Sequence, residues 1–240
     1  MQKAGIKKVA LELGGNAATY IDASANIALA AKRCAVGAFI NSGQVCISLQ
    51  RIYVHESIYD SFAKALVEET KSLQVGSPYD EQTFIGPMVN EAAVEKAKRW
   101  VQSAMNEGAK LLCGGLGKAE GFEKGYFVKP TIFICHNQNL KIVQEEIFGP
   151  VLCVLPYENE QDALIMANNT MFGLSAYVFS NDEAKALAFA RNIRSGRVLI
   201  NTSTSKAKHP PFGGMKQSGL GRMGGRYSMD AFSEIKSILF

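Results

Sequence analysis

Residues 42–48 read Ser42-Gly43-Gln44-Val45-Cys46-Ile47-Ser48, and they lie between a long amphipathic segment and a short β-branched run. The amphipathic segment, residues 24–40, predicts a helix, and residues 51–55 predict a strand. The glycine makes the intervening stretch a turn. A cysteine in such a turn can meet a substrate, whereas most cysteines of intracellular proteins are small buried hydrophobic residues. We therefore take Cys46 as a candidate nucleophile.

The same alternation of short β-branched runs with longer amphipathic ones continues along the chain. We predict strands over residues 8–13, 51–55, 127–135, 151–157, 175–180 and 197–201. We predict helices over residues 24–40, 57–73, 90–107, 160–168 and 182–193. This order indicates an α/β fold, a three-layer α/β/α sandwich with a largely parallel sheet.

Composition and charge narrow the class of protein. The apolar fraction, 47% of 240 residues, is that of an ordinary globular protein, and Lys and Arg are scattered along a chain of net charge +4, so we expect no nucleic-acid partner. The apolar runs are shorter than the roughly 20 residues of a membrane span, and the start lacks the apolar core of a secretion signal. Five dispersed cysteines indicate free thiols in a reducing compartment. We expect a cytoplasmic protein without a membrane anchor and, because its three histidines lack ligand spacing, without a metal.

A carboxylate 34 residues before Cys46 gives the cysteine a chemical partner. Glu12 lies in Leu11-Glu12-Leu13-Gly14-Gly15, just before a Gly-Gly break. Chemistry through an acyl-sulfur intermediate needs a nucleophile that holds the acyl group and a base that delivers water to it. Without Cys46, Glu12 would be interpreted as a solvated carboxylate at a strand edge.

A glycine motif near the end of the sequence is deceptive. Residues 219–224 match G-x-G-x-x-G, the pattern of dinucleotide-binding turns. That interpretation requires a strand before the motif, and Met215–Ser218 has no strand pattern. It also requires an acidic residue about 20 positions later, and only 16 residues follow Gly224. We predict that these glycines form turns.

Four motifs, taken together, resemble one family. Residues 11–15 resemble its glutamate signature, and residues 43–46 its cysteine signature. Residues 145–150 resemble its cofactor-ribose segment, and residues 211–219 its late glycine-rich signature. They occur in the family's order, so the chain resembles the C-terminal, catalytic-domain half of an NAD(P)-dependent aldehyde dehydrogenase. The resemblance implies oxidation of a small aldehyde to a carboxylic acid with NAD or NADP, in a homodimer or higher homo-oligomer.

The resemblance also assigns roles to the matching residues. Cys46 would attack the aldehyde carbonyl, and the thiohemiacetal would lose hydride to the cofactor and become a thioester. Glu12 would activate the water that releases the acid, and the backbone N–H of Cys46 would donate to the oxyanion. Glu146 would hydrogen-bond the nicotinamide-side ribose, and Phe148 would pack beside the nicotinamide. Without the motif around them, these two would be a surface carboxylate and a core aromatic.

The resemblance also implies a tunnel through which the substrate enters. Asn201, at a strand end, and Phe212, at a turn, would line this tunnel. The loop between them is polar and contains Lys206. In one interpretation this loop is simply solvated. In the other, Lys206 faces the tunnel mouth and favours an anionic or hydroxylated short aldehyde.

The resemblance implies a division of the chain and leaves alternatives open. Residues 1–14 would be the last strand of a truncated cofactor-binding domain, residues 15–217 the catalytic domain, and residues 218–240 a segment returning toward the cofactor domain. Because most of the cofactor domain would be absent, we expect the fragment itself to be inactive as a dehydrogenase. Met223 stands where family members commonly have Glu. A coenzyme A-acylating relative, or a catalytically silent binding or structural descendant, remains an alternative.

Overall fold

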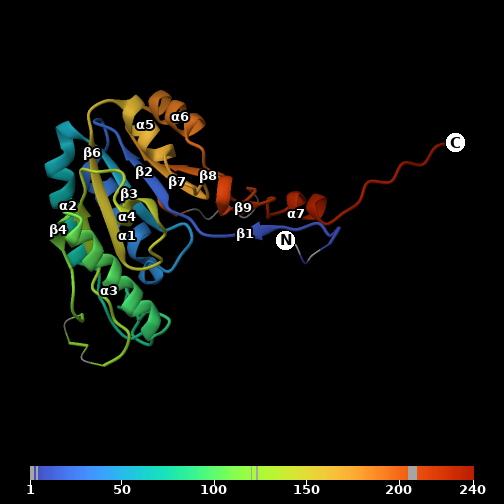
Figure 1. Cartoon of the computed structure of the whole chain (residues 1–240). Coiled ribbons are helices and arrows are strands. Elements are labelled where there is room, and N and C mark those ends of the chain that lie inside the picture. Colours follow the sequence, from blue (N-terminus) through green and yellow to red (C-terminus); the bar gives the residue numbers. More distant parts are fainter. Residues whose placement is uncertain (1–2, 4, 120, 123, 205–209) are drawn as a thin grey trace.

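A seven-stranded sheet forms the centre of the computed structural model, which describes residues 3, 5–119, 121–122, 124–204 and 210–240 (Figure 1). The strand order is β4-β5-β6-β3-β2-β7-β8. Every neighbouring pair is parallel except β4 with β5. The strands are β2 (Ala17–Ile21), β3 (Leu49–His55), β4 (Lys110–Cys113), β5 (Thr131–Ile134), β6 (Val151–Tyr157), β7 (Ser175–Phe179) and β8 (Arg197–Ile200).

Helices cover both faces of this sheet, which confirms the predicted three-layer sandwich. One face packs against α1 (Ile27–Phe39) and α2 (Tyr59–Lys71). The other face packs against α3 (Glu91–Asn106), α4 (Lys141–Gln144), α5 (Glu160–Asn168) and α6 (Glu183–Asn192). Successive residues of β6 alternate between the two cores, as the period of two along a strand requires.

Four of the helices begin at a residue whose side chain caps them. Asn26, Asn90, Asn159 and Asp182 each accept a hydrogen bond from the backbone N–H three residues later, at 2.9–3.0 Å. Such caps each stabilise a helix by about 1 kcal/mol. Their positions explain why the predicted and observed starts of these helices agree within a few residues.

The two ends of the chain form an arm that extends from the sheet (Figure 1). Here β1 (Leu11–Glu12) pairs antiparallel with β9 (Gly219–Leu220), and α7 (Arg226–Ala231) follows. A Cβ added to Gly219 would lie 2.0 Å from the carbonyl oxygen of Leu11, so the strand pairing requires this glycine. Gly221 and Gly224 have φ values of 79° and 101°, which are turn conformations that favour glycine. The G-x-G-x-x-G pattern is thus explained by strand contact and turns, as predicted.

The structure also corrects several sequence predictions. The central strand β2 and the edge strand β4 were not predicted. The strand predicted over residues 8–13 is reduced to the two-residue β1, which pairs with the two-residue β9. The strand predicted over residues 127–135 begins only after Pro130, which has no N–H to donate to a ladder. None of the helices in the described ranges is both long enough and apolar enough to traverse a bilayer.

Candidate active site

The predicted catalytic residues meet at the edge of the sheet where β2, β3 and β6 begin. Cys46 precedes β3, Glu146 precedes β6, and Glu12 lies five residues before β2. Because β2 with β3 and β3 with β6 are parallel neighbours, the segments that lead into them lie at the same edge. The sheet topology therefore brings together motifs that lie up to 134 residues apart in sequence.

The turn that carries Cys46 is held in an uncommon backbone conformation. Asn41, Ser42 and Gly43 all have positive φ values, of 50°, 57° and 68°. The hydroxyl of Ser42 donates to the carbonyl of Gly86 at 2.7 Å. A Cβ added to Gly43 would lie 2.2 Å from the carbonyl oxygen of Gly149, so this turn touches the segment that carries Glu146. Close backbone contact of this kind explains the glycine of the cysteine motif.

The Gly-Gly pair after Glu12 makes two further close contacts. A Cβ on Gly15 would lie 2.0 Å from the carbonyl oxygen of Cys46, and one on Gly14 would lie 2.5 Å from Oε2 of Glu146. The backbone N–H of Gly15 donates to Oε1 of Glu146 at 2.8 Å. The two glycines are therefore the point at which the three predicted motifs are packed together.

The carboxyl group of Glu12 is the second candidate catalytic group. Its Oε2 is buried and has no hydrogen-bond partner among the described residues. Burial raises the pKa of the Glu12 carboxyl, and the nearby charge of Arg222 counteracts that rise. Nη1 of Arg222 is itself bonded to the carbonyls of Gly214 and Gly221, both at 2.8 Å. A buried carboxylate oxygen without a donor can accept a proton from a substrate or a water molecule.

The half-exposed thiol of Cys46 lies in the electrostatic field of two carboxylates. Burial raises its pKa, the backbone N–H groups of Cys46 and Ile47 lower it, and the charges of Glu12 and Glu146 raise it again, so that the pKa lies above its ordinary value. These influences mean that the thiol lies within electrostatic range of both carboxylates. They also mean that the thiol remains protonated near neutral pH unless a base takes its proton.

Phe148 has a strained conformation that points to function. Its φ is 55°, and its side chain is 43% exposed. Holding a bulky residue there costs on the order of 1–3 kcal/mol. The segment is held on one side, because the N–H of the buried Ile147 donates to Oε1 of Gln50 at 3.0 Å. An aromatic ring presented to solvent beside Glu146 is suited to stacking on a planar ligand.

The remaining predicted residues fall in different places. Phe212 forms an isolated antiparallel bridge with Met223, and the adjacent Gly213 lies beside Glu12, so Phe212 borders the site. Asn201 bonds the backbone of Ser180 through both amide atoms, at 3.0 and 2.9 Å. These bonds are at the carboxyl ends of β7 and β8, the opposite edge of the sheet from Cys46. Lys206 lies outside the described residues.

Two residues near the site were not predicted. Arg51 is 1% exposed, and no described acidic residue forms an ion pair with it. It donates to Oδ1 and the carbonyl of Asn16 at 3.0 Å each, and to the hydroxyl of Tyr53 at 2.8 Å, so it anchors the segment after Gly15. Tyr177 donates to the carbonyl of Ile47 at 2.7 Å and so fixes the residue after Cys46. One feature of the sequence indicated the importance of Arg51, a charged residue within a predicted strand. No feature of the sequence indicated Tyr177.

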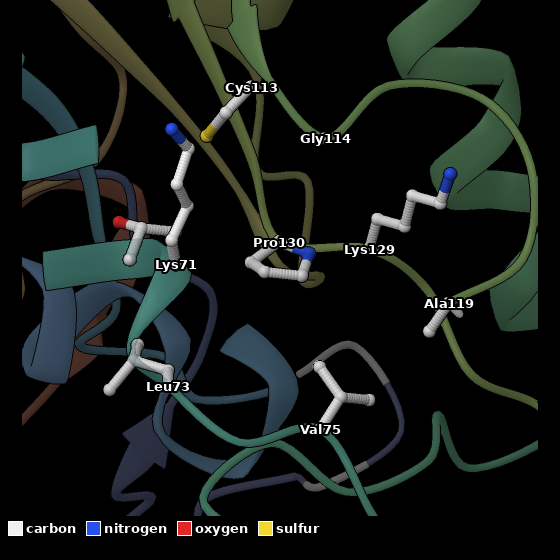
Figure 2. Close-up of a pocket in the computed structure, with 9 residues that line it drawn as sticks. Lys71, Leu73, Val75, Cys113, Gly114, Ala119, Lys129 and Pro130 are labelled. Atoms are coloured by element: carbon white, nitrogen blue, oxygen red, sulfur yellow. The ribbon is translucent and has the colours of Figure 1, made fainter. Parts of the chain in front are cut away.

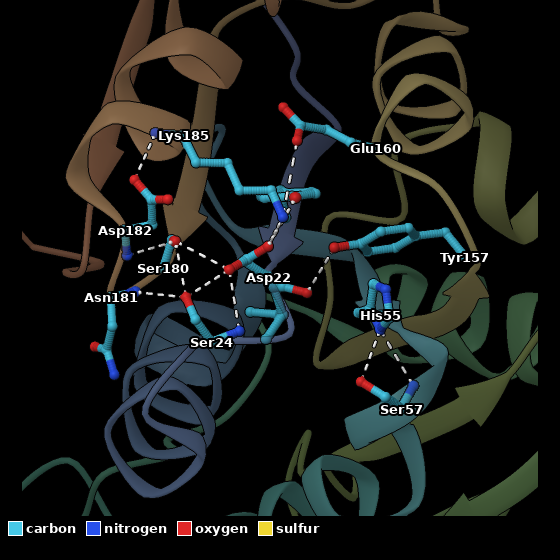
Figure 3. A network of polar contacts seen from close by, with 12 residues as sticks. Asp22, Ser24, His55, Ser57, Tyr157, Glu160, Ser180, Asn181, Asp182 and Lys185 are labelled. Carbon is cyan, nitrogen blue, oxygen red and sulfur yellow. Dashed lines mark hydrogen bonds and ion pairs between the residues drawn. The ribbon is translucent and has the colours of Figure 1, made fainter.

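The opposite edge of the sheet carries a polar cluster around Asp22 (Figure 3). Asp22 accepts from the backbone N–H of Ser24 at 3.0 Å and the hydroxyl of Ser180 at 3.1 Å, and it forms an ion pair with Lys185. Burial alone would raise the pKa of Asp22, but the bonds from Lys185 and Ser24 hold it well below its usual range. Because its acceptors are satisfied, this carboxylate stabilises the loop ends.

A separate cavity of about 470 Å³ lies beside α2 and β4 (Figure 2). Lys71, Cys113 and Lys129 are among its lining residues. None of the candidate catalytic residues lines it. It is therefore distinct from the edge that carries Cys46.

A family model agrees with this geometry. The model of the aldehyde dehydrogenase family matches residues 1–238. The chain therefore belongs to the aldehyde dehydrogenase family.

Individual relatives are similar over nearly the whole chain. The 3-sulfolactaldehyde dehydrogenase of Priestia megaterium is 40% identical over 238 residues, which are 99% of this chain and 49% of the relative. The mitochondrial succinate-semialdehyde dehydrogenase of Oryza sativa subsp. japonica is 40% identical over 97% of this chain and 44% of its own length. The chain thus spans about half the length of the curated relatives it matches.

Solved structures match the fold equally well. The NAD-dependent aldehyde dehydrogenase from Sinorhizobium meliloti superposes with a TM-score of 0.94 at 40% identity, covering 98% of this chain and 46% of that one. A Mycobacterium tuberculosis aldehyde dehydrogenase complexed with NAD+ superposes with a TM-score of 0.93 at 36% identity, covering 96% and 47%. These likenesses confirm the predicted fold class.

Proposed function

We propose that this chain carries the nucleophile and the base of an NAD(P)-dependent aldehyde dehydrogenase, Cys46 and Glu12. The observation that supports this most directly is the unpartnered, buried Oε2 of Glu12 in the electrostatic neighbourhood of the Cys46 thiol. Such an arrangement provides both groups that acyl chemistry on sulfur requires.

The chain's own residues account for the proton and acyl transfers. Glu12, whose pKa is raised, takes the proton of the Cys46 thiol or of an attacking water. The Cys46 thiolate adds to the aldehyde carbonyl to form a thiohemiacetal, and the backbone N–H of Cys46 donates to its oxyanion. After oxidation the acyl group is held as a thioester on Cys46. Water, deprotonated by Glu12, then attacks this thioester and releases the carboxylic acid and the thiolate.

Glu146 and Phe148 fit the nicotinamide end of NAD or NADP. Oε1 of Glu146 is bonded to Gly15, and no hydrogen bond to Oε2 is formed within the described chain, so Oε2 is available for a ribose hydroxyl. Phe148 offers an exposed ring beside it. The cofactor, when bound, supplies the acceptor for the hydride that leaves the thiohemiacetal. Asn201 and Phe212 remain proposed tunnel residues, with contacts that favour Phe212.

The division of the chain follows the same logic. We propose that residues 15–217 form the catalytic domain, and that residues 1–14 and 218–240 lead toward a cofactor-binding domain. The pairing of β1 with β9 supports these boundaries. Placement in the C-terminal half of the longer relatives, and association into a homodimer or higher homo-oligomer, also remain proposals. Light scattering tests the assembly, since a 26 kDa particle at all concentrations would contradict it.

A test that needs no cofactor uses p-nitrophenyl acetate with this chain. Acyl transfer to Cys46 releases nitrophenolate, and water then cleaves the thioester. We expect an initial burst followed by slow turnover. Cys46→Ala abolishes the burst, while Glu12→Gln keeps it and lowers the later turnover by about 10²-fold or more, the usual contribution of a general base. A burst that survives in Cys46→Ala would place the nucleophile elsewhere, and no reaction of the unmodified chain would favour a silent fragment.

A further inference from the structure

Among the described residues, Arg197 is a cation that borders the candidate site and has no acceptor for its charge. We propose that Arg197 selects the substrate class by binding the terminal oxyanion of a short aldehyde that carries a carboxylate or sulfonate. The inference rests on the proposed function, because it adds a specificity residue to the same site. The residue proposed here is not Lys206, the lysine predicted from the sequence. The proposal is supported by contacts among the described residues.

The backbone places Arg197 on the side of the sheet that faces Cys46. It is the first residue of β8 and pairs with Ser175 of β7. Because side chains alternate along a strand, Arg197 projects to the same face as Tyr177, the residue two positions after its strand partner. Tyr177 bonds the carbonyl of Ile47 at 2.7 Å, directly after Cys46.

A second line of contacts leads from Arg197 to Glu12. The guanidinium lies over the ring of Phe212, 5.9 Å from its centroid. Gly213, the residue after Phe212, lies beside the Glu12 carboxylate, because an added Cβ would lie 3.2 Å from Oε1 of Glu12. A Cβ on Gly196 would lie 1.8 Å from the carbonyl oxygen of Gly213, so the start of β8 is packed directly on this turn. Arg197 is thus linked to the nucleophile through Tyr177 and to the base through Phe212.

The guanidinium of Arg197 makes no hydrogen bond or ion pair with any described residue. The contrast with Arg51 is informative, since the donors of that buried guanidinium bond to backbone carbonyls, an amide oxygen and a hydroxyl. Arg222 also donates to two carbonyls. Arg197 is half-buried, and the face of its guanidinium packs over the ring of Phe212. The N–H groups along the edge of the guanidinium can donate two parallel hydrogen bonds to two oxygens of a carboxylate or sulfonate.

The charge of Arg197 also affects the electrostatics at the edge of the candidate site. Burial raises the pKa of the Tyr177 phenol, and Arg197 counteracts that rise. The charges that act on the Cys46 thiol are those of Glu12 and Glu146. The charge of Arg197 acts at Tyr177, whose hydroxyl bonds the carbonyl of Ile47 beside Cys46. It also offsets the repulsion that Glu12 and Glu146 exert on an anionic substrate.

Alkylation of Cys46 tests the proposal on the chain as it exists. Iodoacetate and iodoacetamide react identically: the sulfur forms a bond to carbon, iodide leaves, and the thiol proton passes to solvent. They differ in the carboxylate that one of them carries. We expect Arg197→Met to lower the iodoacetate rate at Cys46 by about tenfold, as for the loss of one charge-assisted hydrogen bond, with the iodoacetamide rate within twofold. Arg197→Lys retains part of the preference.

Matched controls separate a local effect from a general one. Arg191→Met removes the same charge from the exposed last turn of α6 and should leave the ratio of the two rates unchanged. Cys113, read by mass spectrometry in the same samples, should keep its own ratio in every variant. If Arg197→Met leaves the ratio of the two rates at Cys46 unchanged, the proposed role of Arg197 is refuted. The same holds if Arg191→Met changes that ratio equally. Neither result affects the proposed nucleophile. A Cys46 that reacts with neither reagent overturns the proposed nucleophile, and the Arg197 proposal with it.

Discussion

Adding one methyl group at Gly15 should disable the site without unfolding the protein. The new Cβ of Gly15→Ala would lie 2.0 Å from the carbonyl oxygen of Cys46 and 3.2 Å from its carbonyl carbon. Side-chain Cβ atoms essentially never approach backbone this closely, so the two segments must separate by about 1 Å, and a misplacement of that size can lower a rate by about 10²-fold. Overpacking of this kind costs about 1–3 kcal/mol of stability.

Two measurements on the same variant check this reasoning. The burst rate with p-nitrophenyl acetate reports the placement of Cys46, and urea unfolding reports the free energy of unfolding. Gly86→Ala is the matched control, because a Cβ there meets no atom within 4 Å. It should react at the rate of the unmodified chain. Gly15→Ala reacting at that rate, with unchanged stability, would refute the packing of Cys46 on the Gly-Gly segment.

Two further predictions concern pH. Because Glu12 raises the pKa of Cys46, Glu12→Gln should shift the pH profile of Cys46 alkylation by iodoacetamide to lower pH, and a shift to higher pH or none would contradict their proximity. Asp22→Ala should lower the free energy of unfolding by about 1–3 kcal/mol at neutral pH, because it removes the shared acceptor of Ser24, Ser180 and Lys185. The folded pKa of Asp22 is depressed, so this stabilisation is present above the unfolded pKa of about 3.9 and is lost as pH falls through the folded value. Denaturation curves should show that the difference in free energy of unfolding between the unmodified chain and Asp22→Ala is smaller at pH 3 than at pH 7.

The sequence predicted the layers of the fold well, because periodicity is a local property. Strand β6 and helix α5 lie at the predicted residues, and polar caps mark the starts of α1, α3 and α6. Strand β2 was missed because Ala17–Ile21 contains two alanines and is buried throughout, without a polar alternation to reveal it. It is nevertheless the strand that places Gly15 against Cys46.

The candidate site was predictable only in its parts. Cys46 and Glu12 could be named as candidates from their motifs, but the meeting of their segments depends on the strand order β6-β3-β2, which no local pattern encodes. Asn201 was placed at a strand end correctly, yet its amide is used at the opposite edge of the sheet from Cys46. The role proposed for Arg197 could not be predicted, because it rests in part on the contact with an aromatic residue 15 positions away in sequence.

The pairing of β1 with β9 also has a consequence for the order of events during protein synthesis. Gly219, the strand partner of Glu12, is made more than two hundred residues after it. The ladder that positions the carboxylate therefore cannot close until nearly all of this chain has been translated, by which time the sheet around Cys46 can already have formed. Under the proposed function, a ribosome stalled before Gly219 would carry a folded thiol turn without a positioned base, so the nascent chain would be acylated but would release its acyl group slowly.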